Sequence, residues 1–202
     1  MRKLLFSIPA LLLLVSCASV NINSQRLSQD TKTYKSFLVI QSNAEDIFYE
    51  WNEENYQYIL FGKFNDLDHD QDRKMLANSL KRFMHPVQLR FVNEYFPIHR
   101  PIPFEDFKET VEKLDHEGVL LVHTREKWID EEYTDSGRVT RPNTEYHVFI
   151  LDRENMDMVW LGKSLASGAG VNDFQDLYNA FSKELAKDLH LKGLIEKTYP
   201  WY

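Results

Sequence analysis

The sequence predicts an α/β fold in which helices pack on a single mixed β-sheet. Short apolar runs alternate with amphipathic helical patterns in the first part of the chain, three strand-like segments follow one another, and an amphipathic segment closes the pattern. The chain has 202 residues, of which 43% are hydrophobic and 13% aromatic, so it can bury the core of one domain. We expect this single domain to span residues 34–202.

The first part of the domain predicts strands and helices in alternation. The expected elements are a strand at residues 34–41, a possible extra strand at 56–64, a helix at 71–84, a strand at 87–96 and a helix at 104–114. The first strand holds four successive apolar residues, as a strand buried on both faces does. In both helices apolar residues recur every three or four positions. Pro86 ends the first helix, and Gly118 follows the second.

The second part of the domain predicts a three-strand meander and a closing helix. The expected elements are strands at residues 119–122, 146–151 and 157–165 and a helix at 174–189. Between the first two strands the chain is long and charged, and the Asp135-Ser136-Gly137 triplet is typical of a turn. No internal repeat or second domain is evident, so we expect all strands to join one sheet.

The first seventeen residues have the order of a secretory signal peptide. Two basic residues precede an apolar run of about a dozen residues, too short for the ~20 residues that cross a bilayer as a helix. The run ends in Leu14-Val15-Ser16-Cys17, which resembles the lipobox of bacterial lipoproteins. That resemblance implies that residues 1–16 are removed and that Cys17 carries a diacylglycerol and an acyl chain. Ala18 differs from the Asp of an inner-membrane retention signal, so we expect a periplasm-facing outer-membrane lipoprotein.

Residues 17–33 are polar and lack both helical and alternating apolar periods, so we expect a lipidated flexible tether. Removal of residues 1–16 changes the charge from 24 − 31 = −7 to 22 − 31 = −9. Such an acidic chain is poorly suited to nucleic acid or to an anionic membrane surface. We therefore expect no nucleic-acid partner and a membrane contact made by the lipid alone.

A run of alternating carboxylates begins at Asp66 and includes Asp68 and Asp70. It imitates the start of a calcium loop, but an EF-hand requires Gly at its sixth position and Glu at its twelfth. Those positions hold Gln71 and Ala77. We therefore prefer a solvated acidic turn whose carboxylates cap the helix that follows, with Asp66, Asp68 and Asp70 as weak candidates for a cation site.

The candidate catalytic groups lack the patterns that their chemistry requires. Ser164 lies in a sequence similar to a nucleophile elbow, but within a predicted strand and without the final glycine. His123 and His147 could face one another across neighbouring strands, where a hydrogen-bonded pair is more common than a zinc site. The Gly168-Ala169-Gly170 loop lacks the third glycine of a dinucleotide site. We expect no catalytic residue and no cofactor.

The strand pattern around Asp152 carries a family resemblance. An apolar strand after a helix, a strand ending in Asp152, the pair Val159-Trp160, the Gly168 loop and a closing helix resemble the amino-terminal domain of TolB and related periplasmic lipoproteins of the CsgG kind. The resemblance implies non-catalytic binding or assembly with another envelope protein.

Two classes of function follow from these patterns. In the first, the protein binds an envelope partner through exposed aromatic residues, for which the candidates are Trp128, Tyr199, Trp201 and Tyr202. In the alternative, it is an envelope hydrolase that acts on glycan or peptide with the acidic groups of residues 66–72 or with His123 and His147.

Overall fold

A computed structural model describes residues 18–29, 32–43, 64–65, 67–96, 102–135 and 137–198. The elements, in chain order, are β1 (Ser19–Arg26), β2 (Ser36–Ser42), α2 (Asp70–Met84), β3 (Gln88–Phe91), the 3-10 helix η1 (Val92–Glu94), α3 (Phe104–Lys113), β4 (Gly118–Thr134), β5 (Gly137–Asp152), β6 (Met158–Ser167) and α4 (Phe174–Leu191). The possible extra strand at residues 56–64 lies, except for Phe64, outside the described residues.

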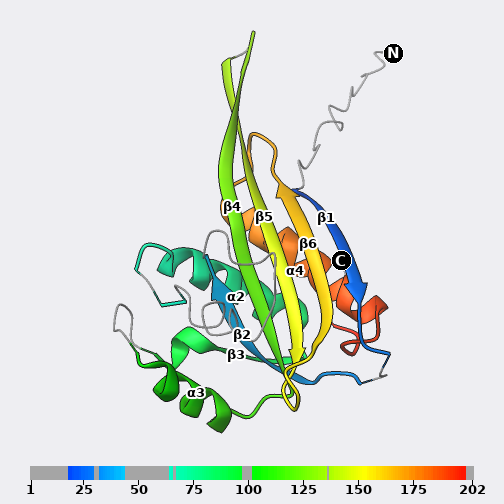
Figure 1. Cartoon of the computed structure of the whole chain (residues 1–202). Coiled ribbons are helices and arrows are strands. Elements are labelled where there is room, and N and C mark those ends of the chain that lie inside the picture. The colour runs from blue at the N-terminus through cyan, green and yellow to red at the C-terminus, as the bar shows by residue number, and fades with distance from the viewer. Residues whose placement is uncertain are drawn as a thin grey trace, which may run out of the picture.

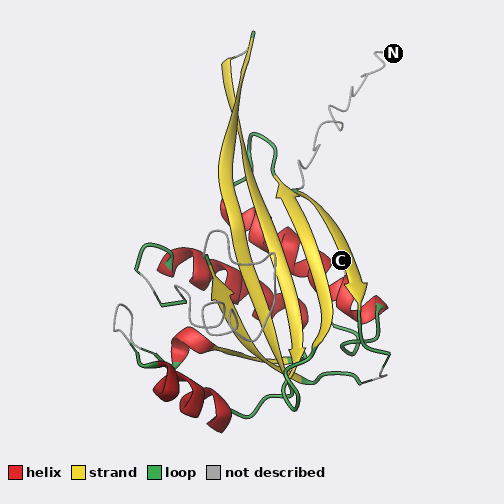
Figure 2. Ribbon diagram, in the orientation of Figure 1, coloured by secondary structure: helices red, strands yellow, loops and turns green. Residues whose placement is uncertain are grey.

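Six strands form one mixed sheet in the order β1-β6-β5-β4-β2-β3 (Figures 1 and 2). β2 pairs in parallel with both β3 and β4, whereas β4, β5, β6 and β1 are successively antiparallel. The parallel pairs are possible because α2 and α3 provide the crossover connections. The predicted α/β fold with one mixed sheet and packed helices is confirmed.

Helices cover both faces of the sheet. α2 and α4 pack on the face that buries Leu120 and Trp160. On the opposite face, Phe107 of α3 packs with Phe64 and Phe96, and the three ring centroids lie 5.2 to 5.5 Å apart. All seven residues of β2 are buried because the strand is central and covered from both sides, as its apolar run predicts.

The predicted strand at residues 87–96 is shorter in the structure. Pairing with β2 ends at Phe91, and the chain then enters η1. Val92 and Phe96 are both buried on the α3 side of the sheet, so the turn places apolar residues that are four apart in one cluster. Their burial explains why an apolar segment that suggested a longer strand instead bends away from the sheet.

The expectation of a flexible tether over residues 17–33 is wrong for Ser19–Arg26, which form β1. This strand pairs antiparallel with β6 along its whole length, from Ser19 with Ser167 to Arg26 with Trp160. Val20 and Ile22 pack on the core, while the alternate residues face outward. Because an edge strand buries only one face, two apolar residues are enough to pack β1 on the core. An alternation of only two apolar residues is too short to predict a strand from the sequence.

Candidate functional site

β4 and β5 extend well past the rest of the sheet as a projecting hairpin (Figures 1 and 2). Asn143 is the last residue of β5 in that direction that pairs with β6. Beyond it, residues 129–134 pair with residues 137–142, and no third strand of the described residues joins them. We call these twelve residues the arm. Six residue pairs at ~3.4 Å per residue give it a length of about 20 Å.

The base of the arm is attached to both helices of one layer. Lys127 donates to both carboxylate oxygens of Asp72 in α2, each at 2.8 Å, and its ammonium lies 4.0 Å from the ring centroid of Phe174 in α4. On the β5 side, the backbone N–H of Gly168 donates to the Pro142 carbonyl at 2.8 Å. These contacts fix the direction of the arm relative to the core.

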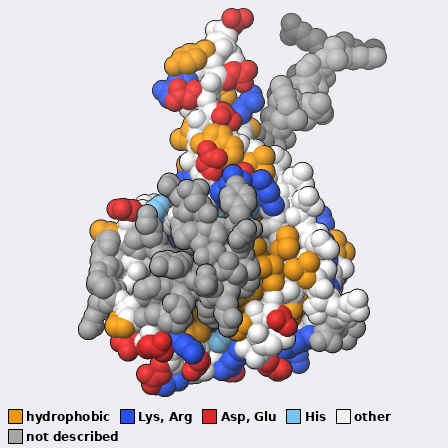
Figure 3. Space-filling view, in the orientation of Figure 1, with side chains coloured by type: hydrophobic (Ala, Val, Ile, Leu, Met, Phe, Trp, Pro, Cys, Tyr) orange, Lys and Arg blue, Asp and Glu red, His pale blue; other side chains and the backbone are white. Residues whose placement is uncertain are grey.

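The charged side chains of the arm pair across the two strands. Arg141 donates to Glu132 at 2.7 Å, and Arg138 makes a short ion pair with Glu131. Figure 3 shows hydrophobic, acidic and basic side chains close together on this projection. The strands predicted at residues 119–122 and 146–151 are therefore much longer in the structure, because cross-strand pairs of opposite charge favour pairing of the charged residues between them.

The arm also exposes two large apolar side chains. Ile129 is 53% exposed and Tyr133 78% exposed. Both lie an even number of residues from Lys127, so they share the sheet face on which Lys127 meets α2 and α4. The two exposed apolar side chains of the arm therefore lie on one face of the hairpin, the same face that α2 and α4 cover in the core.

We predict that replacing Lys127 with Ala loosens the arm. The change removes an ion pair with both partners about one-third exposed and a cation–π contact, together worth about 1 kcal/mol. Amide hydrogen exchange should accelerate in residues 129–134 but not in β2. Lys113→Ala is the matched control, since it removes an exposed i,i+4 pair with Glu109 on α3; equal exchange in both variants would contradict the prediction.

The described residues include one of the four predicted aromatic partner-binding residues. Trp128 is half-buried in β4 and pairs with Asn143, so it lies at the base of the arm rather than on its projecting part. Tyr199, Trp201 and Tyr202 lie outside the described residues, as does Cys17. Ile129 and Tyr133 are the exposed arm residues that sequence reasoning missed, because they stand singly among charges.

His123 and His147 face one another, as predicted. They are paired in register across β4 and β5, and their ring centroids lie 6.4 Å apart. Burial, followed by the neighbouring His147, lowers the pKa of His123 to about 4. The Glu145 carboxylate beside them accepts from Arg125 at 2.8 Å, Lys163 at 2.9 Å and His147 at 3.2 Å. Glu145 therefore neutralises nearby cations, while His123 remains neutral at pH 7.

The other predicted candidates take structural positions. Ser164 is 1% exposed within β6, which is not the exposed strand-to-helix turn of a nucleophile elbow. Asp66 lies outside the described residues, and the described residues contain no group of three potential ligands around Asp68 and Asp70. The predicted carboxylate cap of the following helix is wrong, because His69 is the N-cap and makes no side-chain cap bond. Asp70 instead pairs with Lys74 at 2.6 Å.

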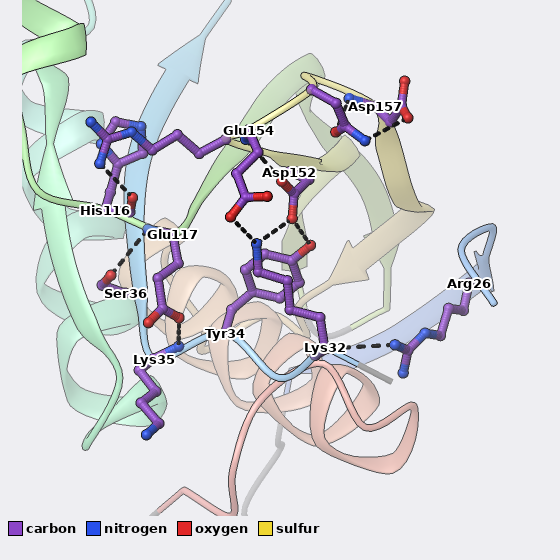
Figure 4. A network of polar contacts seen from close by, with 12 residues as sticks. Arg26, Lys32, Tyr34, Lys35, Ser36, His116, Glu117, Asp152, Glu154 and Asp157 are labelled. Carbon is purple, nitrogen blue, oxygen red and sulfur yellow. Dashed lines mark hydrogen bonds and ion pairs between the residues drawn. The ribbon is translucent and has the colours of Figure 1, made fainter. Parts of the chain in front are cut away.

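Asp152, the residue at the centre of the family resemblance, joins distant segments at the other end of the sheet (Figure 4). One carboxylate oxygen accepts from Lys32 at 2.6 Å and from the Tyr34 hydroxyl at 2.8 Å, and the other accepts from the Glu154 backbone N–H at 2.9 Å. Burial alone would raise the pKa of Asp152, but these hydrogen bonds outweigh it and lower the pKa. A cavity of about 370 Å³ lies beside this network and is lined in part by Asp152. Both oxygens of the Asp152 carboxylate already accept hydrogen bonds from within the protein.

We predict that Asp152→Ala lowers the free energy of unfolding by about 2 kcal/mol, because three hydrogen bonds are lost and the Tyr34 hydroxyl remains buried. Urea unfolding at pH 7 measures the change. Glu154→Ala is the control, since Glu154 is 85% exposed and lies 3.8 Å from the same Lys32 ammonium. Similar losses in the two variants would show that Asp152 acts only through surface charge.

Comparisons with known proteins assign no family to the chain. No protein-family model and no curated protein matches the chain. Solved structures with a similar arrangement include a PelC dodecamer from Paraburkholderia phytofirmans, with 12% identity over 89% of this chain and 99% of that one and a TM-score of 0.48. The lipoprotein GNA1162 from Neisseria meningitidis has 11% identity over 77% of this chain and 98% of that one, with a TM-score of 0.35.

A third similar structure is the hypothetical protein CT253 from Chlamydia trachomatis, with 14% identity over 78% of this chain and 92% of that one and a TM-score of 0.37. Among the described residues, no helix has the length and apolar character needed to cross a membrane.

Proposed function

We propose that the protein is a lipid-anchored component of the bacterial outer membrane that faces the periplasm and binds another envelope component through its arm, without catalysing a reaction. The arm carries this proposal. It projects about 20 Å as an isolated two-stranded hairpin, it is held at its base by α2 and α4, and its apolar residues Ile129 and Tyr133 are exposed. An isolated hairpin buries little surface of its own, so a binding role accounts for its length better than stability does.

The lipobox-like segment and the resemblance to TolB and CsgG-type lipoproteins support the same role. Cys17 lies two residues before Ser19, the first residue of β1. Two residues span at most ~7 Å, so lipidation of Cys17 holds the domain against the bilayer rather than on a long tether. The binding surface then works at the membrane, where an envelope protein or the lipid surface itself is within its reach.

A hydrolase is the weaker candidate on this geometry. His123 is 2% exposed, and Glu145 is engaged by Arg125 and Lys163, so neither can reach a glycan or peptide without rearrangement. Hydrolysis of envelope glycan or peptide by the purified protein, abolished by His123→Gln, would reverse this preference.

The proposed function has two separate tests. Mass spectrometry of the mature protein should find a diacylglycerol and an acyl chain on Cys17, and Cys17→Ala should release the protein from the membrane fraction. A photo-crosslinking residue at position 133 should form adducts in intact envelopes, whereas one at Glu154, an exposed site at the opposite end of the sheet, should not. An unmodified Cys17, or adducts from position 154 alone, would contradict the proposal.

A further inference from the structure

The start of β1 and the arm lie at the same end of the sheet. Ser19 pairs with Ser167, and Ser167 pairs with Asn143. The arm begins at the next residue of β5, Pro142, and continues in the direction from which β1 enters the sheet (Figure 1). Two strand spacings, about 10 Å, separate Ser19 from the base of the arm.

This arrangement limits how close Cys17 can lie to the end of the arm, measured along the strand direction. The arm extends about 20 Å past the row that contains Ser19. Cys17 can lie at most ~7 Å beyond that row, because it is two residues from Ser19. The difference between these two lengths is ~13 Å, so the end of the arm lies at least that far past Cys17 when the strands point at the bilayer. This distance exceeds the ~5 to 8 Å thickness of one interfacial layer of the bilayer.

We propose that the arm lies in the lipid head-group layer beside the protein's own anchor, with Ile129 and Tyr133 turned toward the hydrocarbon. This inference rests on the proposed lipidation of Cys17 and identifies the envelope component that the arm contacts. The arm tilts into the layer rather than piercing it, because its ion pairs are costly to place in hydrocarbon. The lipid is then not the sole membrane contact that the net charge suggested.

The exposed apolar residues of this end fit an interfacial site. Val171 is 82% exposed and Tyr133 78% exposed, and these are the two highest values among the exposed large apolar residues of the described chain. Val171 follows Gly170, where an added Cβ would lie 2.7 Å from the Val139 side chain, so the loop after β6 runs alongside the arm. Tyrosine suits this depth, since its ring is apolar and its hydroxyl reaches water.

The charge of the arm determines which lipids it accepts. Residues 129–142, which are the arm and the two residues between its strands, contain four acidic residues and two arginines, which gives 2 − 4 = −2. Its intrinsic affinity for lipid is therefore small, and for anionic lipid it is unfavourable at low salt. The anchor compensates for this, because it holds the arm at a high effective concentration near the surface. Zwitterionic head groups are the favoured neighbours.

The test places a fluorophore on the arm of the lipidated protein. Lipidation consumes the single native cysteine, so Tyr133→Cys provides one free thiol for an environment-sensitive dye. Glu154→Cys, at the other end of the sheet, is the matched control. In phosphatidylcholine vesicles that contain a head-group spin label, we expect quenching several-fold stronger at position 133 than at position 154. Replacement of part of the lipid by phosphatidylglycerol should reduce the difference at low salt.

The outcomes separate this inference from the proposed function. If Cys17 carries lipid but quenching is equal at positions 133 and 154, the inference is overturned and the proposed function stands. The same holds if crosslinking in envelopes joins position 133 to protein and not to lipid. Absence of lipid on Cys17 overturns the anchor and the inference together. Unchanged thermal unfolding of both cysteine variants shows that the fold is retained; this is expected because both positions are exposed.

Discussion

Replacement of Trp160 with Ala should lower the free energy of unfolding by about 3 to 5 kcal/mol. The side chain is completely buried between the sheet and α4. Its indole N–H donates to Asp188 at 3.2 Å, and the same carboxylate accepts from Ser24 of β1 at 2.8 Å. Truncation therefore opens a large cavity and removes one donor from the carboxylate that links α4 to the edge strand.

Urea unfolding followed by circular dichroism measures this loss, and Trp128→Ala is the control. Trp128 is also a tryptophan in a strand, but it is half-buried at the base of the arm, so its truncation should cost clearly less. Equal losses would mean that the core around Trp160 relaxes to fill the cavity.

A coupled variant tests the packing around the same ring. A Cβ added at Gly162 would lie 2.5 Å from the Trp160 ring, so Gly162→Ala alone should destabilise the protein by roughly 1 to 3 kcal/mol. In a Trp160→Ala background the same change should cost far less, since the obstructing ring is absent. Additive effects of the two substitutions would show that Gly162 is required for another reason.

Acidification from pH 6.5 to pH 4 should destabilise the protein by about 3 kcal/mol through His123. Its pKa in the folded protein is about 4, below the ordinary value of 6.5, because burial disfavours the imidazolium. Between these values the unfolded chain binds the proton and the folded chain does not. The stability contributed by neutral His123 is therefore complete above pH 6.5 and is lost progressively as the pH falls.

The free energy of unfolding at pH 7, 5 and 4 should show this slope in the native chain and lose most of it in His123→Phe. His147→Gln provides a second comparison, because the neighbouring His147 contributes to the lowered pKa of His123. That variant should keep a reduced slope. A native slope that survives His123→Phe would assign the acid sensitivity to other groups.

Local patterns identified the elements that bury a continuous apolar run or one whole apolar face. The four apolar residues of β2 and the run that opens β4 predict central strands, and both are buried. The helical periods around Leu80 and Phe181 predict α2 and α4, which pack with these residues completely buried. Such elements are recognisable because one chain segment carries the whole signal.

Sequence reasoning found less of the candidate site. Trp128 was chosen for its aromatic ring, but the pairing of β4 with β5 places it at the base of the arm. Tyr133 projects because its strand continues beyond β6, and that depends on where β6 ends. The length of a neighbouring strand is a property of the whole sheet and has no counterpart in the residues around Tyr133.

The sequence by itself determined that this chain builds one mixed sheet with helices packed on it, because continuous apolar runs and 3.6-residue periods are sufficient to define buried strands and helices. Tertiary structure alone decided that Ser19–Arg26 join the sheet as β1 and that the arm projects from it. Both segments are mostly polar. β1 is held by backbone pairing with the distant strand β6, and the arm projects because β4 and β5 continue to pair with each other past the end of β6, so local apolar patterns reveal neither placement.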